Sequence, residues 1–262
     1  MAGIVRLARL RDQGRIFYAV LEDGERLREI AGDPFEGDPF HPEAGASGAG
    51  RPAGGLAWLP PCRPSKIIGV GRNYRDHVAE LGHSVPSEPL LFLKPPSSLL
   101  PHGGVIRLPS GSRRVDFEGE LGVVIGREAR RVPEASALDH VLGYACVNDV
   151  TARDLQVRDV QFTRSKGFDS FCPFGPCIAI GLRPDDLVVE TLVNGVRRQS
   201  APVSRLIFGI PRLISFASDV MTLLPGDLIA TGTPEGVGPL EPGDEVTVSI
   251  EGVGQLTNRV EG

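Results

Sequence analysis

The sequence predicts a mainly β fold of the α+β class, and three observations indicate it. Most apolar segments are short runs rich in Val, Ile and Leu, such as residues 120–126 and 176–181, and this length and composition are typical of strands. The 33 Gly and 23 Pro among the 262 residues are spread along the chain, as expected for many turns between short strands. Two segments have the spacing of helices, residues 132–143 and 203–224. The length suffices to bury the core of one large domain, or of a large and a small one.

Residues 1–60 are expected to form a small N-terminal β domain. Three strand-like runs lie at its start: residues 4–10, 15–24 and 25–30. Asp23-Gly24 is a hairpin signal between the last two. Residues 32–55 contain 7 Gly and 4 Pro without periodicity, so we interpret them as a linker. The main domain is then expected to begin near Leu56, and we assign residues 61–262 to it.

Strands dominate the main domain. Six runs have strand character: residues 65–71, 89–94, 120–126, 144–150, 176–181 and 187–199. Asn194-Gly195 divides the last run and predicts a hairpin turn. Pro-Gly-Asp occurs at 225–227 and at 242–244, each time before a further strand-like run. Pro133 suits the first turn of one predicted helix, and Pro211 predicts that residues 203–224 form two short helices.

Charge and cysteine content exclude several classes of protein. The net charge of -5 provides no basic surface for nucleic acid or an anionic membrane. The sequence contains no run of 18 apolar residues, and charges interrupt its first 14 residues, so we expect a cytoplasmic protein without a signal peptide. The four cysteines show no zinc-ligand spacing, and we interpret them as buried thiols.

Three carboxylates lie within apolar, strand-like segments: Glu118 and Glu120 in residues 115–126, and Asp149 in residues 143–156. Burial of an ionised carboxylate is costly unless it is compensated, and a hard divalent cation is the usual compensation. Residues i and i+2 of a strand share a face, so Glu118 and Glu120 can converge, and a neighbouring strand could supply Asp149. The alternative is that these acids are paired or solvent-facing on an edge strand.

His77 and Glu80 lie on a predicted helical turn, where positions i and i+3 share a face. A histidine oriented by a carboxylate is a general-base arrangement, because imidazole exchanges its proton near neutral pH. The alternative is an ordinary pair on a helix surface.

Arg153, Gln156 and Lys166 follow the third carboxylate closely. Three carboxylates around a divalent cation leave a formal charge of about -1, so an anionic substrate needs additional positive charge. Arg153 and Lys166 could supply it, while Gln156 donates to a developing oxyanion. Alternatively, Arg153 and Lys166 pair with Asp154 or Asp169 at the surface.

A Gly/Pro/Thr loop at residues 229–240 follows a predicted strand. It could present backbone N–H groups and the Thr233 hydroxyl to a ligand, or it could be a simple turn.

Six segments, in this order, resemble the fumarylacetoacetate hydrolase superfamily: GVGRNYRDHVAELG, PLLFLKPPSSL, VDFEGELGVVIGREAR, GYACVNDVTARDLQ, FTRSKGFDSFCPFGP and PGDLIATGTPEGVGPLEPGD. The resemblance covers about residues 64–260. It implies a mixed β-sandwich roll, a homodimer, and a carboxylate triad that binds Mg2+ or Mn2+. By motif position this triad corresponds to Glu118, Glu120 and Asp149. Many bacterial relatives carry a similar small N-terminal domain.

The resemblance also implies roles for other residues. The catalytic dyad of the family, carried on a lid, corresponds to His77 and Glu80. The catalytic lysine of the family corresponds to Lys166, and the glutamine that donates to the oxyanion corresponds to Gln156. Four residues in matching motifs are expected to bind substrate: Arg72, Lys94, Arg153 and Thr233.

The implied chemistry is stabilisation of an enolate derived from a small 2-oxo or 2-hydroxydienoic acid or diacid, with no nucleic-acid or membrane partner. The sequences of these motifs are most similar to those of the bacterial 2-hydroxyhepta-2,4-diene-1,7-dioate isomerases and decarboxylases of aromatic catabolism. Acylpyruvate hydrolysis and oxaloacetate decarboxylation remain alternatives, as does a non-catalytic dimer that binds a metal or a dicarboxylate. The sequence does not choose between hydrolysis, decarboxylation and isomerisation.

Overall fold

The computed structural model describes residues 3–22, 26–37 and 39–262, and their strands form three sheets. The large sheet contains β1 (Val5–Asp12), β2 (Arg15–Glu22), β3 (Arg26–Ile30), β4 (Ala46–Pro52), β5 (Ala57–Leu59), β6 (Ile67–Gly71), β7 (Leu90–Lys94), β8 (Leu99–Leu100), β11 (Gly119–Ile125), β12 (Val141–Asn148), β14 (Cys172–Ile180) and β17 (Leu228–Ala230). A second sheet contains β9 (Val105–Arg107), β15 (Val188–Val193), β16 (Val196–Pro202), β19 (Glu245–Ile250) and β20 (Gly254–Glu261). The smallest sheet contains β10 (Val115–Phe117), β13 (Thr151–Ala152) and β18 (Gly238–Pro239). The mainly β fold predicted from the sequence is confirmed.

Helices are short. The α-helices are α1 (Arg75–Glu80), α2 (Arg153–Arg158), α3 (Thr163–Lys166) and α4 (Ile210–Val220). The 3-10 helices are η1 (Pro34–Glu36), η2 (Pro42–Gly45), η3 (Pro96–Ser98), η4 (Glu134–His140), η5 (Pro184–Asp186) and η6 (Val203–Arg205). Within the described ranges, no helix is long and apolar enough to cross a membrane.

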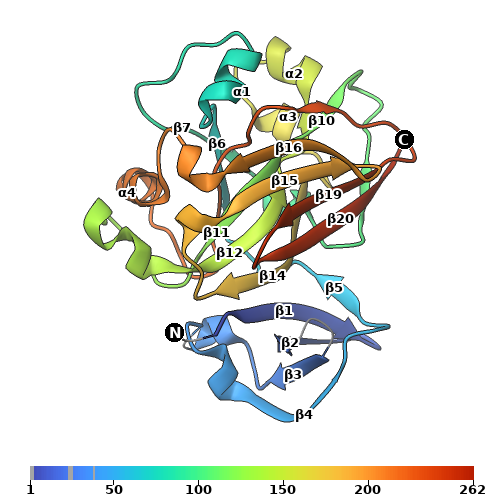
Figure 1. Cartoon of the computed structure of the whole chain (residues 1–262), viewed down its shortest axis with the longest axis vertical. Coiled ribbons are helices and arrows are strands. Elements are labelled where there is room, and N and C mark those ends of the chain that lie inside the picture. Colours follow the sequence, from blue (N-terminus) through green and yellow to red (C-terminus); the bar gives the residue numbers. More distant parts are fainter. Residues whose placement is uncertain (1–2, 23–25, 38) are drawn as a thin grey trace.

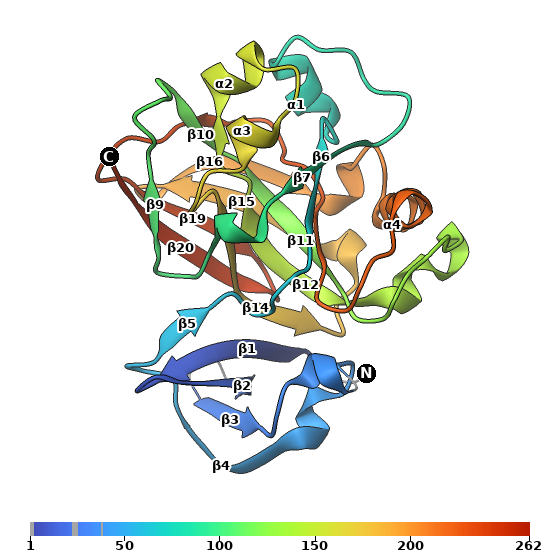
Figure 2. The same cartoon turned by 180° about the vertical axis from the view of Figure 1, so that it is seen from behind.

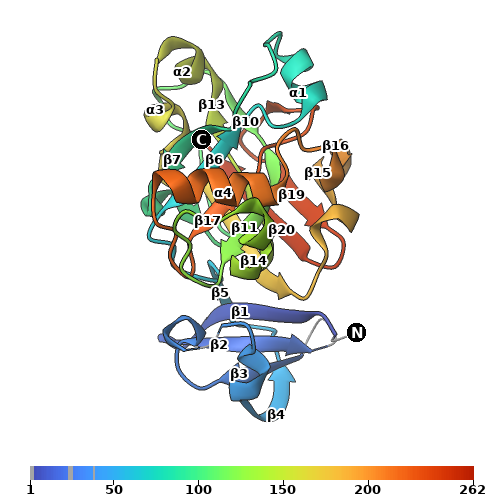
Figure 3. The ribbon, with the colours of Figure 1, turned by 90° about the vertical axis from the view of Figure 1, so that its left-hand side faces the viewer.

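The central strand β11 separates two parts of the hydrophobic core. Its side chains are all buried, and successive residues of a strand point to opposite faces. Leu121 and Val123 pack with α4 and with strands of the second sheet, and Figure 3 shows α4 lying across this side of the large sheet. Val124 packs on the opposite face with residues of β1, β12 and β14. The large sheet is therefore covered on both faces along β11.

The N-terminal strands continue the large sheet, because β1 pairs antiparallel with β14. Figures 1 and 2 show these strands at the end of the molecule opposite α1 and α2. Residues 32–55, interpreted above as a linker, contain η1, η2 and β4, and β4 pairs with β3. An edge strand such as β4 tolerates Pro52 and several glycines, since on one side of it no described strand pairs with it. The predicted Asp23-Gly24 hairpin lies outside the described residues.

Most of the elements predicted in the main domain are present. Asn194 and Gly195 join β15 to β16 with φ of 51° and 76°, which confirms the predicted hairpin. The predicted interruption at Pro211 is also confirmed, because η6 ends before α4 begins and this proline lies in the first turn of α4. The helix predicted over 132–143 is the shorter η4, because Val141 already begins β12. All four cysteines are buried free thiols, as predicted.

Candidate active site

The three carboxylates predicted as metal ligands converge at one point. Glu118 lies between β10 and β11, Glu120 lies in β11, and Asp149 directly follows β12. β11 and β12 are antiparallel neighbours, and the Asp149 N–H donates to the Glu118 carbonyl oxygen at 2.8 Å. One oxygen from each of the three buried side chains lies within 4.8 Å of the others. The alternative of solvent-facing acids on an edge strand is wrong, because all three side chains are buried and β11 lies between β12 and β17. Pairing with cations, the other part of that alternative, is present for Glu118 and Asp149.

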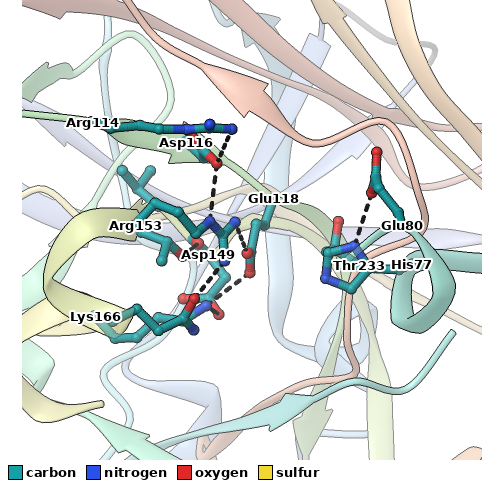
Figure 4. Close-up of polar contacts among 12 residues, drawn as sticks. His77, Glu80, Arg114, Asp116, Glu118, Asp149, Arg153, Lys166 and Thr233 are labelled. Carbon is teal, nitrogen blue, oxygen red and sulfur yellow. Dashed lines mark hydrogen bonds and ion pairs between the residues drawn. The ribbon is translucent and has the colours of Figure 1, made fainter. Parts of the chain in front are cut away.

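Lys166 and Arg153 are buried cations, and they contact Glu118 and Asp149. The Lys166 ammonium donates to Glu118 at 2.8 Å and to Asp149 at 2.5 Å, and Arg153 binds the second oxygen of Glu118. Figure 4 shows both cations on the same side of Glu118. Burial alone would raise the pKa of Glu118, but the charges of Lys166 and Arg153 outweigh it and hold that pKa below its ordinary value. The alternative pairing of these cations with surface aspartates is therefore wrong.

Glu120 has different surroundings. The Gly232 N–H donates to its carboxylate at 2.8 Å, but no ion pair joins Glu120 to a described residue. Burial, followed by the charges of Asp149 and Glu118, raises the pKa of Glu120 well above its ordinary value. A divalent cation would compensate this charge, and closely spaced carboxylate oxygens are the donors that Mg2+ and Mn2+ prefer. The donor set therefore fits such an ion.

His77 and Glu80 form the predicted pair on α1. The His77 ring is only 4% exposed, and its Nδ1 lies 3.2 Å from the Glu80 carboxylate. The Gly236 N–H donates to the same carboxylate at 3.1 Å. His77 also lines the cavity that Glu118, Glu120 and Asp149 line. His77 therefore faces the cavity, and its burial does not fit the alternative of an ordinary surface pair.

The cavity has a volume of about 510 Å³, which suits a small molecule. Its polar and charged lining consists of Arg72, His77, His83, Glu118, Glu120, Asp149, Arg153, Gln156, Asp159, Lys166 and Thr233. Its apolar lining consists of Val70, Leu81, Leu90, Phe92, Val157, Val160 and Phe162. Every residue of this lining comes from position 70 or later, so the described N-terminal strands take no part in it.

Two of the residues predicted to bind substrate have other contacts in the structure. Lys94 is buried and does not line the cavity among the described residues. Its ammonium donates to Asp149 at 2.7 Å and to the Lys166 carbonyl at 2.6 Å. Lys94 therefore holds the Asp149 carboxylate in position without facing the cavity. The Thr233 hydroxyl lines the cavity and donates to the Gly119 carbonyl at 2.8 Å.

Arg72 and Gln156 line the cavity with unused donors. Gln156 accepts a hydrogen bond from Arg153 at 2.6 Å through its side-chain oxygen, and its amide N–H groups have no partner among the described residues. Arg72 forms no hydrogen bond or ion pair with a described residue. Its φ of 58° lies in the left-handed region, where a side chain costs about 1–3 kcal/mol.

The sequence analysis missed Asp116. This fully buried carboxylate accepts hydrogen bonds from Arg114 at 2.9 Å and from Arg153 at 3.0 Å, and Figure 4 shows it beside both guanidinium groups. Asp116 therefore holds the arginine that binds Glu118. The signal was present, because Asp116, Glu118 and Glu120 alternate along the chain and alternate residues of a strand share a face.

Comparison with known proteins identifies the family. Residues 66–261 match the family described as fumarylacetoacetate (FAA) hydrolase C-terminal. The chain belongs to the fumarylacetoacetate hydrolase family. The resemblance inferred from the six motifs is therefore confirmed. Residues 5–61 match a second family, described as Rv2993c-like, N-terminal.

Relatives within the fumarylacetoacetate hydrolase family are named as enzymes. The structure of 2-hydroxyhepta-2,4-diene-1,7-dioate isomerase from Mycobacterium marinum has a TM-score of 0.88 and 42% identity, and the match covers 98% of each chain. Oxaloacetate tautomerase YisK from Bacillus subtilis is 44% identical over 212 residues, which are 76% of this chain and 70% of YisK. Fumarylpyruvate hydrolase from Pseudomonas aeruginosa, in complex with Mn2+ and pyruvate, has a TM-score of 0.73 and 32% identity, with 82% and 92% of the chains covered. This fumarylacetoacetate hydrolase family protein is therefore an enzyme with the mixed β fold of its family.

Proposed function

We propose that the protein is a divalent-metal-dependent isomerase that moves a proton within a small 2-oxo or 2-hydroxydienoic dicarboxylic acid. The observation that carries this proposal is that His77, whose Nδ1 lies 3.2 Å from the Glu80 carboxylate, lines the same cavity as the carboxylates Glu118, Glu120 and Asp149. Proton transfer at the carbon next to a carbonyl needs both a base and stabilisation of negative charge on the carbonyl oxygen. The names of YisK and of the M. marinum isomerase support this reaction class.

The three carboxylates would hold the cation, Mg2+ or Mn2+. When bound there, it supplies Lewis-acid stabilisation of the negative charge at the 2-oxygen of the substrate. Lys166 and Arg153 add positive charge beside these carboxylates. They reduce the repulsion of an anionic substrate from a site that contains three acids.

His77 is the proton carrier in this proposal. An ionised carboxylate can only accept hydrogen bonds, so Glu80 favours the tautomer with the proton on Nδ1 and leaves Nε2 as the base. His77 then removes a proton from one carbon of the substrate and returns it to another. Phe92 and Phe162 form part of the cavity wall, and this apolar surface restricts access of water to the carbanionic carbon.

Arg72 would bind the second carboxylate of the substrate. Its guanidinium lines the cavity without a partner among the described residues, and a guanidinium binds a carboxylate through two parallel hydrogen bonds. The left-handed backbone at Arg72 is the kind of strain that persists where it serves a binding group. This arrangement supports a dicarboxylic acid over an acid with an apolar tail.

A substrate panel tests the proposal. The purified protein is incubated with Mg2+ and oxaloacetate, the heptadiene-dioate, acetylpyruvate or fumarylpyruvate, and the products are identified by ¹H NMR in D2O. Isomerisation gives an unfragmented product in which a proton has moved from one position to another. Two acid fragments would identify a hydrolase, and released CO2 a decarboxylase. If none of the four acids reacts although Mn2+ binds, the protein binds without turnover and the proposed function is wrong.

A further inference from the structure

The loop between β17 and β18 contacts both halves of the site. The N–H of Gly232 donates to the carboxylate of Glu120 at 2.8 Å. Four residues later, the N–H of Gly236 donates to both carboxylate oxygens of Glu80, at 3.1 and 3.3 Å. One short stretch of backbone therefore holds a metal-binding carboxylate at one end and the carboxylate of the His77 pair at the other.

Gln199, on β16, fixes this loop. Its side-chain amide donates to the Thr233 hydroxyl and to the Pro234 carbonyl, both at 2.8 Å. Its side-chain oxygen accepts from the N–H of Gly119 at 3.0 Å, and Gly119 lies between Glu118 and Glu120. Gln199 is 1% exposed, and a buried amide with three satisfied hydrogen bonds holds its partners rigidly.

Gly236 is placed by steric contact as well as by its hydrogen bonds. It has a φ of 94°, a conformation that favours glycine. A Cβ atom at this position would lie 2.2 Å from the carbonyl oxygen of Arg198. The Gly236 N–H thus depends on the backbone of β16 next to Gln199.

We propose that Gln199 and Gly236 are positioning residues for proton transfer. Gln199 fixes the loop against the metal-binding segment, and Gly236 transmits that position to Glu80 and so to the His77 ring. Glu80 needs such support, because its side chain is 34% exposed and could otherwise turn toward water. Lys94, Lys166 and Arg153 hold Glu118 and Asp149 independently of Gln199. The role of His77 as the base rests on the proposed function, whereas the chain of contacts does not.

The first test does not depend on activity. Gln199→Met retains side-chain length without the hydrogen bonds, and Gln255→Met is the matched control on an exposed strand position. The chain has five histidines, so His77→Ala assigns the His77 signals in long-range ¹H–¹⁵N spectra of the metal-free protein. We expect the Nδ1–H tautomer of His77 in the wild type and a mixture of tautomers in Gln199→Met, with the other four histidines unchanged. An unchanged His77 tautomer in Gln199→Met would overturn the proposal.

A double-mutant cycle provides the second test. We expect Gln199→Met to lower kcat about 10- to 100-fold, the range for a misplaced catalytic group, with KM changed less than about threefold. In a His77→Ala background, Gln199→Met should lower kcat less than about twofold further, because the group that it positions is gone. Losses that multiply would indicate general structural damage and contradict the proposal.

Gly236→Ala provides a second variant if Gln199→Met unfolds at assay temperature. It disturbs the Glu80 contact directly, and the same non-additivity with His77→Ala is expected. If the wild type turns over no acid in the panel, the proposed function fails, while the tautomer comparison still decides whether Gln199 positions His77.

Discussion

Glu118 and Glu120 are two residues apart, but their carboxylates have opposite electrostatic surroundings. Glu118 contacts Lys166 and Arg153, whereas Glu120 receives one backbone hydrogen bond and has two carboxylates as neighbours. Removal of one partner from a buried ion pair is costly, whereas removal of an uncompensated buried charge is not. The two glutamates should therefore respond differently to the same substitution in metal-free protein.

In metal-free protein we expect Glu118→Gln to lower the free energy of unfolding by about 3 kcal/mol, because the buried cations lose a charged partner. Glu120→Gln should leave it unchanged or raise it. Both substitutions should weaken Mn2+ binding, since each removes a charged ligand. Urea unfolding in EDTA and Mn2+ titration measure the two effects. Equal destabilisation by both substitutions would contradict the assigned environments.

The raised pKa of Glu120 predicts a pH dependence. Because the folded state binds this proton more tightly than the unfolded state, the metal-free protein loses stability as the pH rises from the ordinary value of 4.5 through the raised folded pKa. Glu120→Gln should remove this loss, and Mg2+ should remove it in the wild type by favouring the ionised form. Thermal unfolding in EDTA at several pH values, for wild type and variant, measures the difference. Parallel curves for the two proteins would show that Glu120 does not titrate in this way.

His77→Ala should separate proton transfer from metal binding. We expect kcat to fall about 10²- to 10⁴-fold, the usual contribution of a general base, while the Mn2+ dissociation constant stays within about threefold because His77 is no ligand. His83→Ala is the matched control, since His83 also lines the cavity but is exposed, and its side chain forms no hydrogen bond with a described residue. A similar loss of kcat in both variants would show that any change to the cavity surface lowers kcat, and would contradict the role of His77 as the base.

Arg72→Gly should weaken substrate binding and raise the stability of the protein. Glycine adopts the left-handed backbone at this position without strain, so we expect the free energy of unfolding to rise by about 1 kcal/mol. The KM for a 2-oxo diacid should rise at least about tenfold, since a charged hydrogen bond contributes about 1.5–3 kcal/mol. A 2-oxo monoacid provides the control, because its KM should change little. A stability gain without a KM change would exclude Arg72 from binding.

At the scale of elements, the patterns of single strands in the sequence were enough to predict where the three carboxylates of the site lie. The alternation of Glu118 and Glu120 in an apolar run predicted their convergence, and β12 supplied Asp149 as expected. Helices α2 and α3 were missed because they are six and four residues long, too short for apolar periodicity. The contacts of Gln199 were also hidden, since its loop partners lie 34 and 35 residues away on another element.

The close approach of β11 to β15 predicts a sensitive position between the two glutamates. A Cβ atom at Gly119 would lie 1.9 Å from the Thr191 hydroxyl oxygen. We expect Gly119→Ala to destabilise the protein by about 1–3 kcal/mol through overpacking, and to weaken Mn2+ binding by displacing Glu118 and Glu120. Gly119→Ala combined with Thr191→Ala should recover most of both losses, because the second change removes the clashing oxygen. Unfolding and Mn2+ titration of both variants measure this, and no recovery would place the strain elsewhere.

At the scale of the whole molecule, the N-terminal strands lie at the end opposite α1 and α2, as Figure 1 shows. These two helices carry His77 and Arg153 of the site. The described N-terminal residues contribute packing to the large sheet but no side chain to the cavity. Leu7 of β1 is fully buried and pairs with Ile178 of β14, so it reports on this junction.

Leu7→Ala should therefore lower stability without changing catalysis. We expect a loss of about 2–5 kcal/mol in the free energy of unfolding, the range for a leucine truncated in a core, while kcat and the Mn2+ dissociation constant stay within about twofold at a temperature where the variant is folded. Ile4→Ala is the control, because Ile4 is 43% exposed and its truncation should cost less than about 0.5 kcal/mol. A drop in kcat of folded Leu7→Ala would show that the junction transmits its packing to the site through β14 and β12, whose neighbour β11 carries Glu120.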